Sequence, residues 1–142
     1  MNIFSYIKTL LTNDNQSVID TCINNHFIEG IDYGSAPEGS NKYLYMNGCI
    51  KILNALHLTT STDIIEQTID HTNGYYAYTC RTVLSDRKGK TVSTGCAACN
   101  SNEDFYRKSN PYASQNLVLQ AARRRSIINA TITMANLSNK FC

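Results

Sequence analysis

The 142-residue sequence has no tryptophan, only two prolines and no apolar run long enough to span a bilayer. Its first residues show no basic segment ahead of an apolar stretch and no cleavage site, so they lack the pattern of a secretory signal. These absences predict a cytoplasmic chain without a membrane partner. Its length predicts a single domain over residues 1–142, large enough for one core and too small for two.

The sequence also lacks the motifs of common catalytic sites. It has no glycine-rich phosphate loop, no H-E-x-x-H pair, no G-x-S-x-G elbow and no carboxylate cluster of the nuclease kind. Asp63, Glu66 and Asp70 are close in sequence, but we expect them to form an ordinary solvated acidic surface. We therefore expect a protein that is not an enzyme and needs no cofactor.

The cysteines predict reduced thiols, because a chain this long and this helical is unlike a small disulfide-bonded scaffold. They are Cys22, Cys49, Cys80, Cys96, Cys99 and Cys142. Cys96 and Cys99 have the spacing of a zinc-binding pair, but a structural zinc site needs a second pair, and no histidines occur at matching spacing. We expect both thiols to face the core from a strand and to bind no metal, although their spacing alone leaves a metal site open.

A long C-terminal helix is predicted over residues 114–137, with Ser114 as its N-cap. Its apolar face collects residues at helical spacing, namely Leu117, Ala121, Ile128, Ile132 and Ala135. Arg124 is expected in the middle of this face, Arg125 beside it and Arg123 on the opposite side. An arginine facing a core needs an anion, a carboxylate or water, because burying it unpaired is costly. The alternative is that Arg124 extends past the apolar face to solvent.

The charges are unevenly distributed along the chain. Residues 1–40 contain one base and five acids, residues 41–110 contain eight bases and six acids, and residues 111–142 contain four bases and no acid. The arginines of the long helix therefore have no acidic neighbour in the sequence. We expect an external polyanion, or an acidic surface elsewhere, to balance them.

The period of the apolar residues changes in the middle of the chain, from helical spacing to alternation. The predicted elements, in chain order, are helices over residues 3–11 and 16–27, a loop over 31–41, a helix over 43–58, strands over 62–71, 75–84 and 91–98, and the long helix. Residues 1–40 would form an N-terminal helical element and residues 43–137 the main unit. This order predicts an α+β fold with N-terminal helices, a three-stranded antiparallel meander and one long C-terminal helix packed across the sheet.

Two features of the predicted meander bear on binding. The hairpin over residues 85–90 is basic, with Arg87, Lys88 and Lys90, and Gly89 suits a positive φ. Tyr76 and Tyr78 lie close to this hairpin, where aromatic rings could stack on bases. The alternative is that they are ordinary half-buried sheet residues.

The return strand carries three small residues, Gly95, Ala97 and Ala98. Small side chains on a strand permit the close approach of another backbone. We therefore expect the long helix, or another segment, to pack tightly there.

Several segments, in this order, resemble one known family. They are E-G-I-D-Y-G from Glu29, G-S-N-K-Y-L-Y-M-N-G-C-I-K-I-L from Gly39, the hairpin segment from Tyr75 to Ser101, and A-A-R-R-R-S-I-I-N-A from Ala121. They resemble short phage and mobile-element proteins that are similar to the single-strand annealing proteins Redβ, RecT, Erf, Sak and Rad-fifty-two. The matching motifs are the helix entry Tyr45-Met46-Asn47-Gly48, the turn Asp86-Arg87-Lys88-Gly89 and the basic pair Arg123-Arg124.

This resemblance implies a β-β-β-α core and a function. In the family, the basic pair contacts the backbone of single-stranded DNA in a groove between the hairpin stem and the long helix, so Arg123 and Arg124 would take that role here. The expected DNA-binding set is Arg123, Arg124, Arg125, Arg87, Lys88, Lys90, Tyr76 and Tyr78. The resemblance also implies a homo-oligomer that acts in the recombination or replication of a phage, plasmid or prophage.

Two other functions remain open at this point. The same surface could bind an acidic protein, as in an inhibitor or regulator of host defence carried by a mobile element. The chain could also be an unrelated single-stranded DNA binder built as an oligonucleotide-binding barrel. That barrel needs five strands, and the sequence predicts three.

Overall fold

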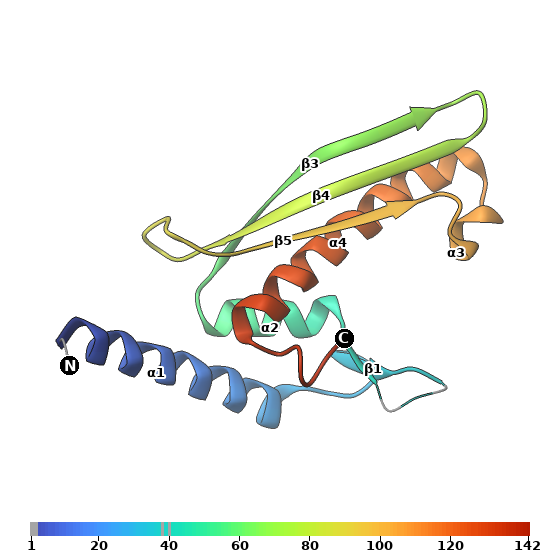
Figure 1. The fold of residues 1–142 in the computed structure, drawn as a ribbon. Helices are drawn as coiled ribbons and strands as arrows, with labels where there is room; N and C mark the ends of the chain where they lie inside the picture. The colour runs from blue at the N-terminus through green and yellow to red at the C-terminus, as the bar shows by residue number, and fades with distance from the viewer. Residues whose placement is uncertain (1–2, 38, 40) are drawn as a thin grey trace.

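The computed structural model describes residues 3–37, 39 and 41–142, with side chains from residue 14 onward (Figure 1). The elements in chain order are α1 (Ile3–His26), β1 (Tyr33–Ser35), β2 (Lys42–Leu44), α2 (Met46–Ala55), β3 (Thr59–Asp70), β4 (Tyr75–Ser85), β5 (Thr91–Asn100), α3 (Asp104–Arg107) and α4 (Pro111–Ala135). The predicted α+β fold is confirmed: a three-stranded antiparallel sheet has the long helix α4 packed against it.

The main sheet is a meander in the order β3-β4-β5. Thr82 of β4 is paired with Thr62 of β3 on one side and with Gly95 of β5 on the other. The predicted alternation of β4 is confirmed, since its even-numbered residues from Tyr76 to Leu84 are buried beneath α4. The two turns of the meander use glycine at positive φ, with Gly74 at 64° and Gly89 at 79°.

The helix α4 lies against β5 at very short range. A Cβ atom built on Gly95 would collide with the backbone of Ala130 and would lie 2.7 Å from the carbonyl oxygen of Ser126. The same contact carries hydrogen bonds, because Ser93 Oγ donates to the Ala130 carbonyl at 3.0 Å and the hydroxyls of Thr82 and Ser126 are 2.7 Å apart. The predicted close approach at Gly95 is therefore confirmed, and its occupant is α4.

The ends of α4 differ from the predicted range of 114–137. The N-cap is Asn110, whose side-chain oxygen accepts from the Tyr112 N–H at 3.0 Å, and Pro111 occupies the first turn. Ser114 was predicted as the N-cap, but it lies inside the helix and its hydroxyl donates to the Pro111 carbonyl at 2.9 Å. The helix ends at Ala135, because Asn136 adopts the left-handed conformation with φ 53°.

The N-terminal part of the chain also differs from the prediction. One continuous helix, α1, replaces the two helices predicted over 3–11 and 16–27. The polar residues 12–15 are weak helix formers, but the segment contains neither glycine nor proline, so nothing in the backbone interrupts the helix. The segment predicted as a loop contains β1, which pairs with β2, and the helix predicted over 43–58 is limited to α2.

A second part of the core lies where α1, α2 and the end of α4 meet. Its buried residues include Ile19 of α1, Ile52 of α2, Ala135 of α4 and Phe141 near the C-terminus. Figure 1 shows α1 and α2 on the side of α4 that faces away from the sheet. As a result, α4 is covered by the sheet along one side and by α2 only over its C-terminal half.

We predict that the Gly95→Ala substitution lowers the free energy of unfolding by about 3 kcal/mol, because the new methyl group meets backbone that has no room to move. Urea denaturation measures this value. The matched control is Gly89→Ala, where a Cβ meets open space and only the positive φ costs free energy, about 1 kcal/mol. An equal loss in the two variants would contradict the tight contact between α4 and β5.

Candidate nucleic-acid interface

The side of α4 away from the sheet is exposed up to the point where α2 begins to cover it, and it forms a stripe there. Its residues are Tyr112, Asn116, Gln120, Arg123 and Arg124, all exposed, and we call them the outer stripe. They recur at three- and four-residue spacing, which places them on one side of a helix. The stripe contains no acidic residue.

The position of Arg124 corrects the predicted apolar face. The face that meets the sheet is formed mainly by small residues, including Ala122, Ser126 and Ala130, which are fully buried. Small side chains face the sheet because the helix and β5 are too close for larger ones. Leu117 is 36% exposed, and Arg124 points to solvent instead of lying in the middle of a buried face.

Arg125 is held by an ion pair that the sequence did not predict. Its guanidinium donates to both carboxylate oxygens of Glu103, at 2.9 and 2.8 Å, and to the carbonyl of Ala98 at 3.0 Å. These hydrogen bonds hold the pKa of Glu103 below its usual value, and they raise the pKa of Arg125 further. Arg125 therefore ties the loop before α3 to β5, and its charge is already balanced within the chain.

Of the two partners expected for the arginines, an external polyanion or an acidic surface elsewhere, Arg125 has the second, in Glu103. The fourth base of the C-terminal segment, Lys140, lies 3.6 Å from the Asp20 carboxylate. Across the side chains that the structure describes, neither Arg123 nor Arg124 has an ion pair. These two arginines are the part of the basic segment that remains available to an external anion.

Two adjoining hollows flank these arginines. One of about 460 Å³, which we call the arginine hollow, is lined by Ile31, Tyr45, Met46, Asn47, Tyr106, Ala121, Arg124, Arg125 and Ile128. The other, of about 340 Å³, is lined by Met46, Gln120, Arg123, Arg124 and Ile127. Arg124 and Met46 line both, so the hollows meet where α4 passes the first turn of α2.

Tyr45 has a fixed position in the arginine hollow. It is the N-cap residue of α2, its N–H donates to the Asp32 carbonyl at 2.9 Å, and its carbonyl accepts from the Cys49 N–H at 3.1 Å. The hydroxyl end of its ring lies against Gly34, where a Cβ atom would collide with it. The motif Tyr45-Met46-Asn47-Gly48 marked this helix entry in the sequence, but nothing in it identified the ring as part of a site.

The two tyrosines predicted to stack on bases lie in the core. Tyr76 is 2% exposed and Tyr78 is 4% exposed, because both point from β4 toward α4. The Tyr78 hydroxyl accepts from Gln115 at 3.0 Å, and the Tyr76 hydroxyl lies 3.1 Å from His71 Nδ1. Their rings are therefore inaccessible to a ligand. Both tyrosines are sheet residues, as the alternative interpretation had it, and they are more deeply buried than the half-buried state expected there.

The structure does not bring the basic hairpin to the arginines. Arg87 and Lys88 line a separate hollow with Leu56 and His57, beyond the C-terminal end of α2. From the hairpin to Ala98, where Arg125 binds, the strand β5 extends over about 26 Å at about 3.3 Å per residue. Figure 1 shows the hairpin at one end of the sheet and α3 at the other. A single groove containing Arg87, Lys88, Lys90 and all three arginines is thus absent from the described chain.

The two edges of the sheet are unlike. The β5 edge is covered by α4 side chains, since Asn129 accepts from the Cys96 N–H at 3.2 Å and Arg125 binds the Ala98 carbonyl. The β3 edge pairs only with β4 and exposes 41–45% of each of Ile64, Ile65 and Ile69. The sheet therefore has one covered edge and one open edge.

Cys96 and Cys99 point to opposite faces of β5. Cys96 is exposed, whereas Cys99 is 2% exposed and burial raises the pKa of its thiol. The prediction that both face the core is wrong for Cys96, because residues three apart on a strand alternate in side. Within the described ranges, no three potential metal ligands come together, and no helix is long and apolar enough to cross a bilayer.

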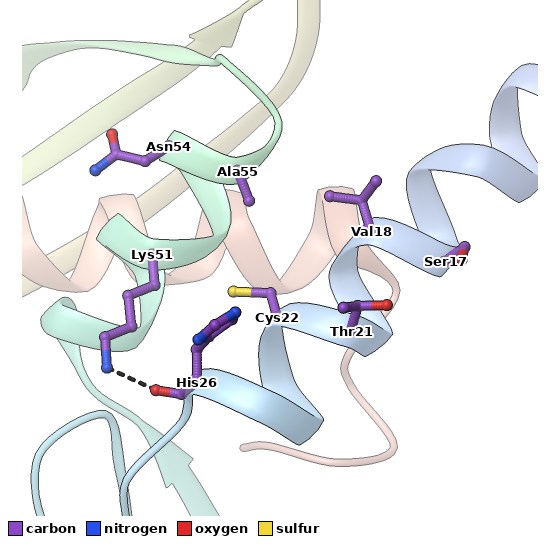
Figure 2. A pocket seen from close by; sticks show the side chains of 8 residues that line it. All are labelled: Ser17, Val18, Thr21, Cys22, His26, Lys51, Asn54 and Ala55. Carbon is purple, nitrogen blue, oxygen red and sulfur yellow. Dashed lines mark hydrogen bonds between the residues drawn. The ribbon is translucent and has the colours of Figure 1, made fainter.

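A further hollow, of about 600 Å³, lies between α1 and α2 (Figure 2). Val18, Cys22 and His26 of α1 face Lys51 and Ala55 of α2 across it. The Lys51 ammonium donates to the His26 carbonyl at 2.8 Å and to the carboxylate of the fully buried Asp32 at 2.6 Å. Its charge is therefore used to hold the end of α1 and the following turn to α2.

No protein-family model matches this chain, and a search of curated proteins finds no match.

We predict that the Glu103→Gln substitution lowers stability by about 1 kcal/mol at neutral pH, a modest value because both partners are partly exposed. The folded protein lowers the pKa of Glu103, so the carboxylate stabilises the fold above its usual pKa of 4.5. This stabilisation is lost as the pH falls through the lower pKa of the folded state. The gap between wild type and variant should accordingly narrow below about pH 4.

Thermal melts of the two proteins between pH 3 and pH 7 measure this gap. In an Arg125→Met background, Glu103→Gln should change stability much less, because the charged partner is gone. A gap that stays constant across the pH range would contradict the ion pair.

Proposed function

We propose that this chain binds single-stranded DNA through the outer stripe of α4 and acts as a binding and annealing protein, without catalysis. The observation that carries the proposal is the pair Arg123 and Arg124, which is exposed on an acid-free helix face and has no ion pair within the described chain. Phosphate groups suit neighbouring guanidinium groups, because each guanidinium can donate two hydrogen bonds to one phosphate, and a nucleic-acid strand presents phosphates in succession.

The surroundings of the arginines favour a single strand over a duplex. Tyr45 is 41% exposed and Ile31 is 49% exposed at the arginine hollow, so apolar surface lies next to positive charge. A single strand presents both phosphates and unpaired bases, and it gains from stacking on aromatic rings. A duplex presents mainly its phosphates and would leave this apolar surface in water.

The order of elements also supports the proposal. The resemblance to annealing proteins implied a β-β-β-α unit with a basic pair on its long helix, and β3, β4, β5 and α4 follow that order. The proposed setting is accordingly recombination or replication of a phage, plasmid or prophage in the cytoplasm of a bacterial host. An acidic protein that binds the same stripe is the competing reading, and the experiment below distinguishes the two.

We predict that replacing Arg123 and Arg124 together by alanine weakens single-stranded DNA binding and flattens its salt dependence. Binding to single strands releases about 0.7 counterion per neutralised phosphate, so losing two contacts should reduce the log–log slope by about 1.4. All oligonucleotide sequences should weaken alike, because phosphate contacts do not read bases. Fluorescence anisotropy with labelled oligonucleotides over a range of salt concentrations measures the slope.

The matched control is the double variant Lys88→Ala and Lys90→Ala, which removes two positive charges at the far end of the sheet. Its effect on the slope should be less than half as large, since the hairpin lies outside the arginine hollow. Wild-type protein that binds no single strand at low salt, or a slope that is unchanged in the arginine variant, would contradict the proposal. The first of these results would favour the protein-interaction reading.

The open β3 edge supports a further part of the proposal, that copies of the chain associate. A long unpaired strand with exposed isoleucines offers free backbone groups and apolar surface to another chain. Asp63 and Glu66 make this strand acidic. A positively charged surface of another copy therefore fits it better than the β3 strand of that copy, whose like charges would repel. Contact between unlike surfaces leads to rings or filaments.

We predict that the wild-type protein at high concentration shows, by light scattering, a mass of at least twice the 15.9 kDa of one chain. Ile69→Lys should reduce this mass, because it places a charge on the associating edge. Val92→Lys is the matched control: Val92 is similarly exposed, at 43%, but lies on β5, and its substitution should leave the mass unchanged. A strict monomer with and without DNA would contradict the association.

A further inference from the structure

The arginine hollow combines three features that phosphate binding alone does not require. It has an aromatic ring, Tyr45, on one wall and apolar side chains, Ile31 and Ile128, beside it. It also contains an exposed amide, Asn47, whose side chain makes no hydrogen bond within the described part of the chain. A site that bound only the sugar–phosphate backbone would need none of these groups.

We propose that the arginine hollow holds one base of the bound strand, stacked on the Tyr45 ring, while Arg124 contacts the adjoining phosphate. This inference rests on the proposed function and adds to it, since the outer stripe could bind phosphates with the hollow empty. The occupant is a base of single-stranded nucleic acid, because such a strand brings a flat apolar face with a negatively charged phosphate attached to it, and the adjoining outer stripe can hold its further phosphates.

The Tyr45 ring is ready to stack before the strand arrives. The backbone of Tyr45 is fixed by hydrogen bonds to Asp32 and Cys49, and the hydroxyl end of its ring lies against Gly34. Stacking on this ring therefore costs little ordering of the protein, which favours binding. Aromatic stacking tolerates every base, since each base has a flat face.

The charges around the hollow fit the same ligand. Arg124 at its rim has no ion pair among the described side chains, whereas Arg125 on the lining is neutralised by Glu103. The net positive charge is thus concentrated at Arg124, where a phosphate next to the stacked base would lie. The Asn47 amide can donate to and accept from the edge of the base.

The experiment compares two labelled oligonucleotides of equal length, poly-dT and a chain of abasic sites, on the full-length protein. Wild type should bind poly-dT about tenfold more tightly, the value expected for one stacked base. Tyr45→Leu keeps apolar bulk but removes the aromatic ring, and it should bring poly-dT binding down to the abasic level. Tyr45→Phe keeps the ring and should stay within about twofold of wild type. The salt slope should be the same in all three proteins, because the phosphate contacts remain.

Two results would overturn this inference while leaving the proposed function standing. They are equal loss of both oligonucleotides in Tyr45→Leu, which would indicate a structural effect, and unchanged poly-dT binding in that variant. Wild-type protein that binds neither oligonucleotide would instead contradict the proposed function itself. The two proposals therefore fail in different ways.

A second variant gives an answer if Tyr45→Leu does not fold. The sequence has no tryptophan, so Tyr45→Trp introduces a single fluorescent indole at the hollow. Poly-dT should quench its emission through stacking, and the abasic chain should not. Emission that is unchanged while anisotropy reports binding would overturn the inference.

Discussion

The contact between α4 and β5 at Gly95 determines where every charged residue of the long helix lies. Because Gly95 has no side chain, the backbone of α4 approaches the strand directly, and only small residues such as Ser126 and Ala130 fit on that side of the helix. This fixes the rotation of α4 about its own axis. Arg125 consequently reaches Glu103 and the edge of β5, while Arg123 and Arg124 are exposed and have no ion pair among the described side chains. The proposed binding surface is thus a consequence of packing on the opposite side of the helix.

The three consecutive arginines have two different roles in this arrangement. A helix turns about 100° per residue, so neighbouring side chains cannot share one environment. Arg125 stabilises the structure by holding the loop before α3 and covering the β5 edge. Arg123 and Arg124 have no such partner within the described residues, and they lie beside a hollow with an exposed tyrosine. This division between a structural arginine and two available ones is the basis for assigning phosphate binding to the pair alone.

The alternating residues of β4, the two glycine turns and the small residues of β5 predicted the meander and its contact with α4 correctly. Periodicity located part of the buried surface of α4, since Ala121, Ile128, Ile132 and Ala135 pack in the core. It did not locate the side that meets the sheet, because that side is mostly alanine and serine, which carry little apolar signal. The pairing of Arg125 with Glu103 joins residues distant in sequence, so no local pattern could reveal it. Likewise, nothing local to Tyr45 shows that it lines a hollow together with α4. Tyr76 and Tyr78 suited base stacking by sequence, but α4 covers their side of the sheet.

The most direct test of the central claim is to observe the arginine side chains individually by NMR, through their Nε–Hε signals, while single-stranded DNA is added. Lysine substitutions one at a time would assign the signals. The account predicts that the signals of Arg123 and Arg124 shift with increasing DNA, while those of Arg125, which is already paired, and of Arg87, at the far hairpin, stay in place. Shifts confined to Arg87, or no shifts of Arg123 and Arg124 under conditions where DNA is bound, would contradict it.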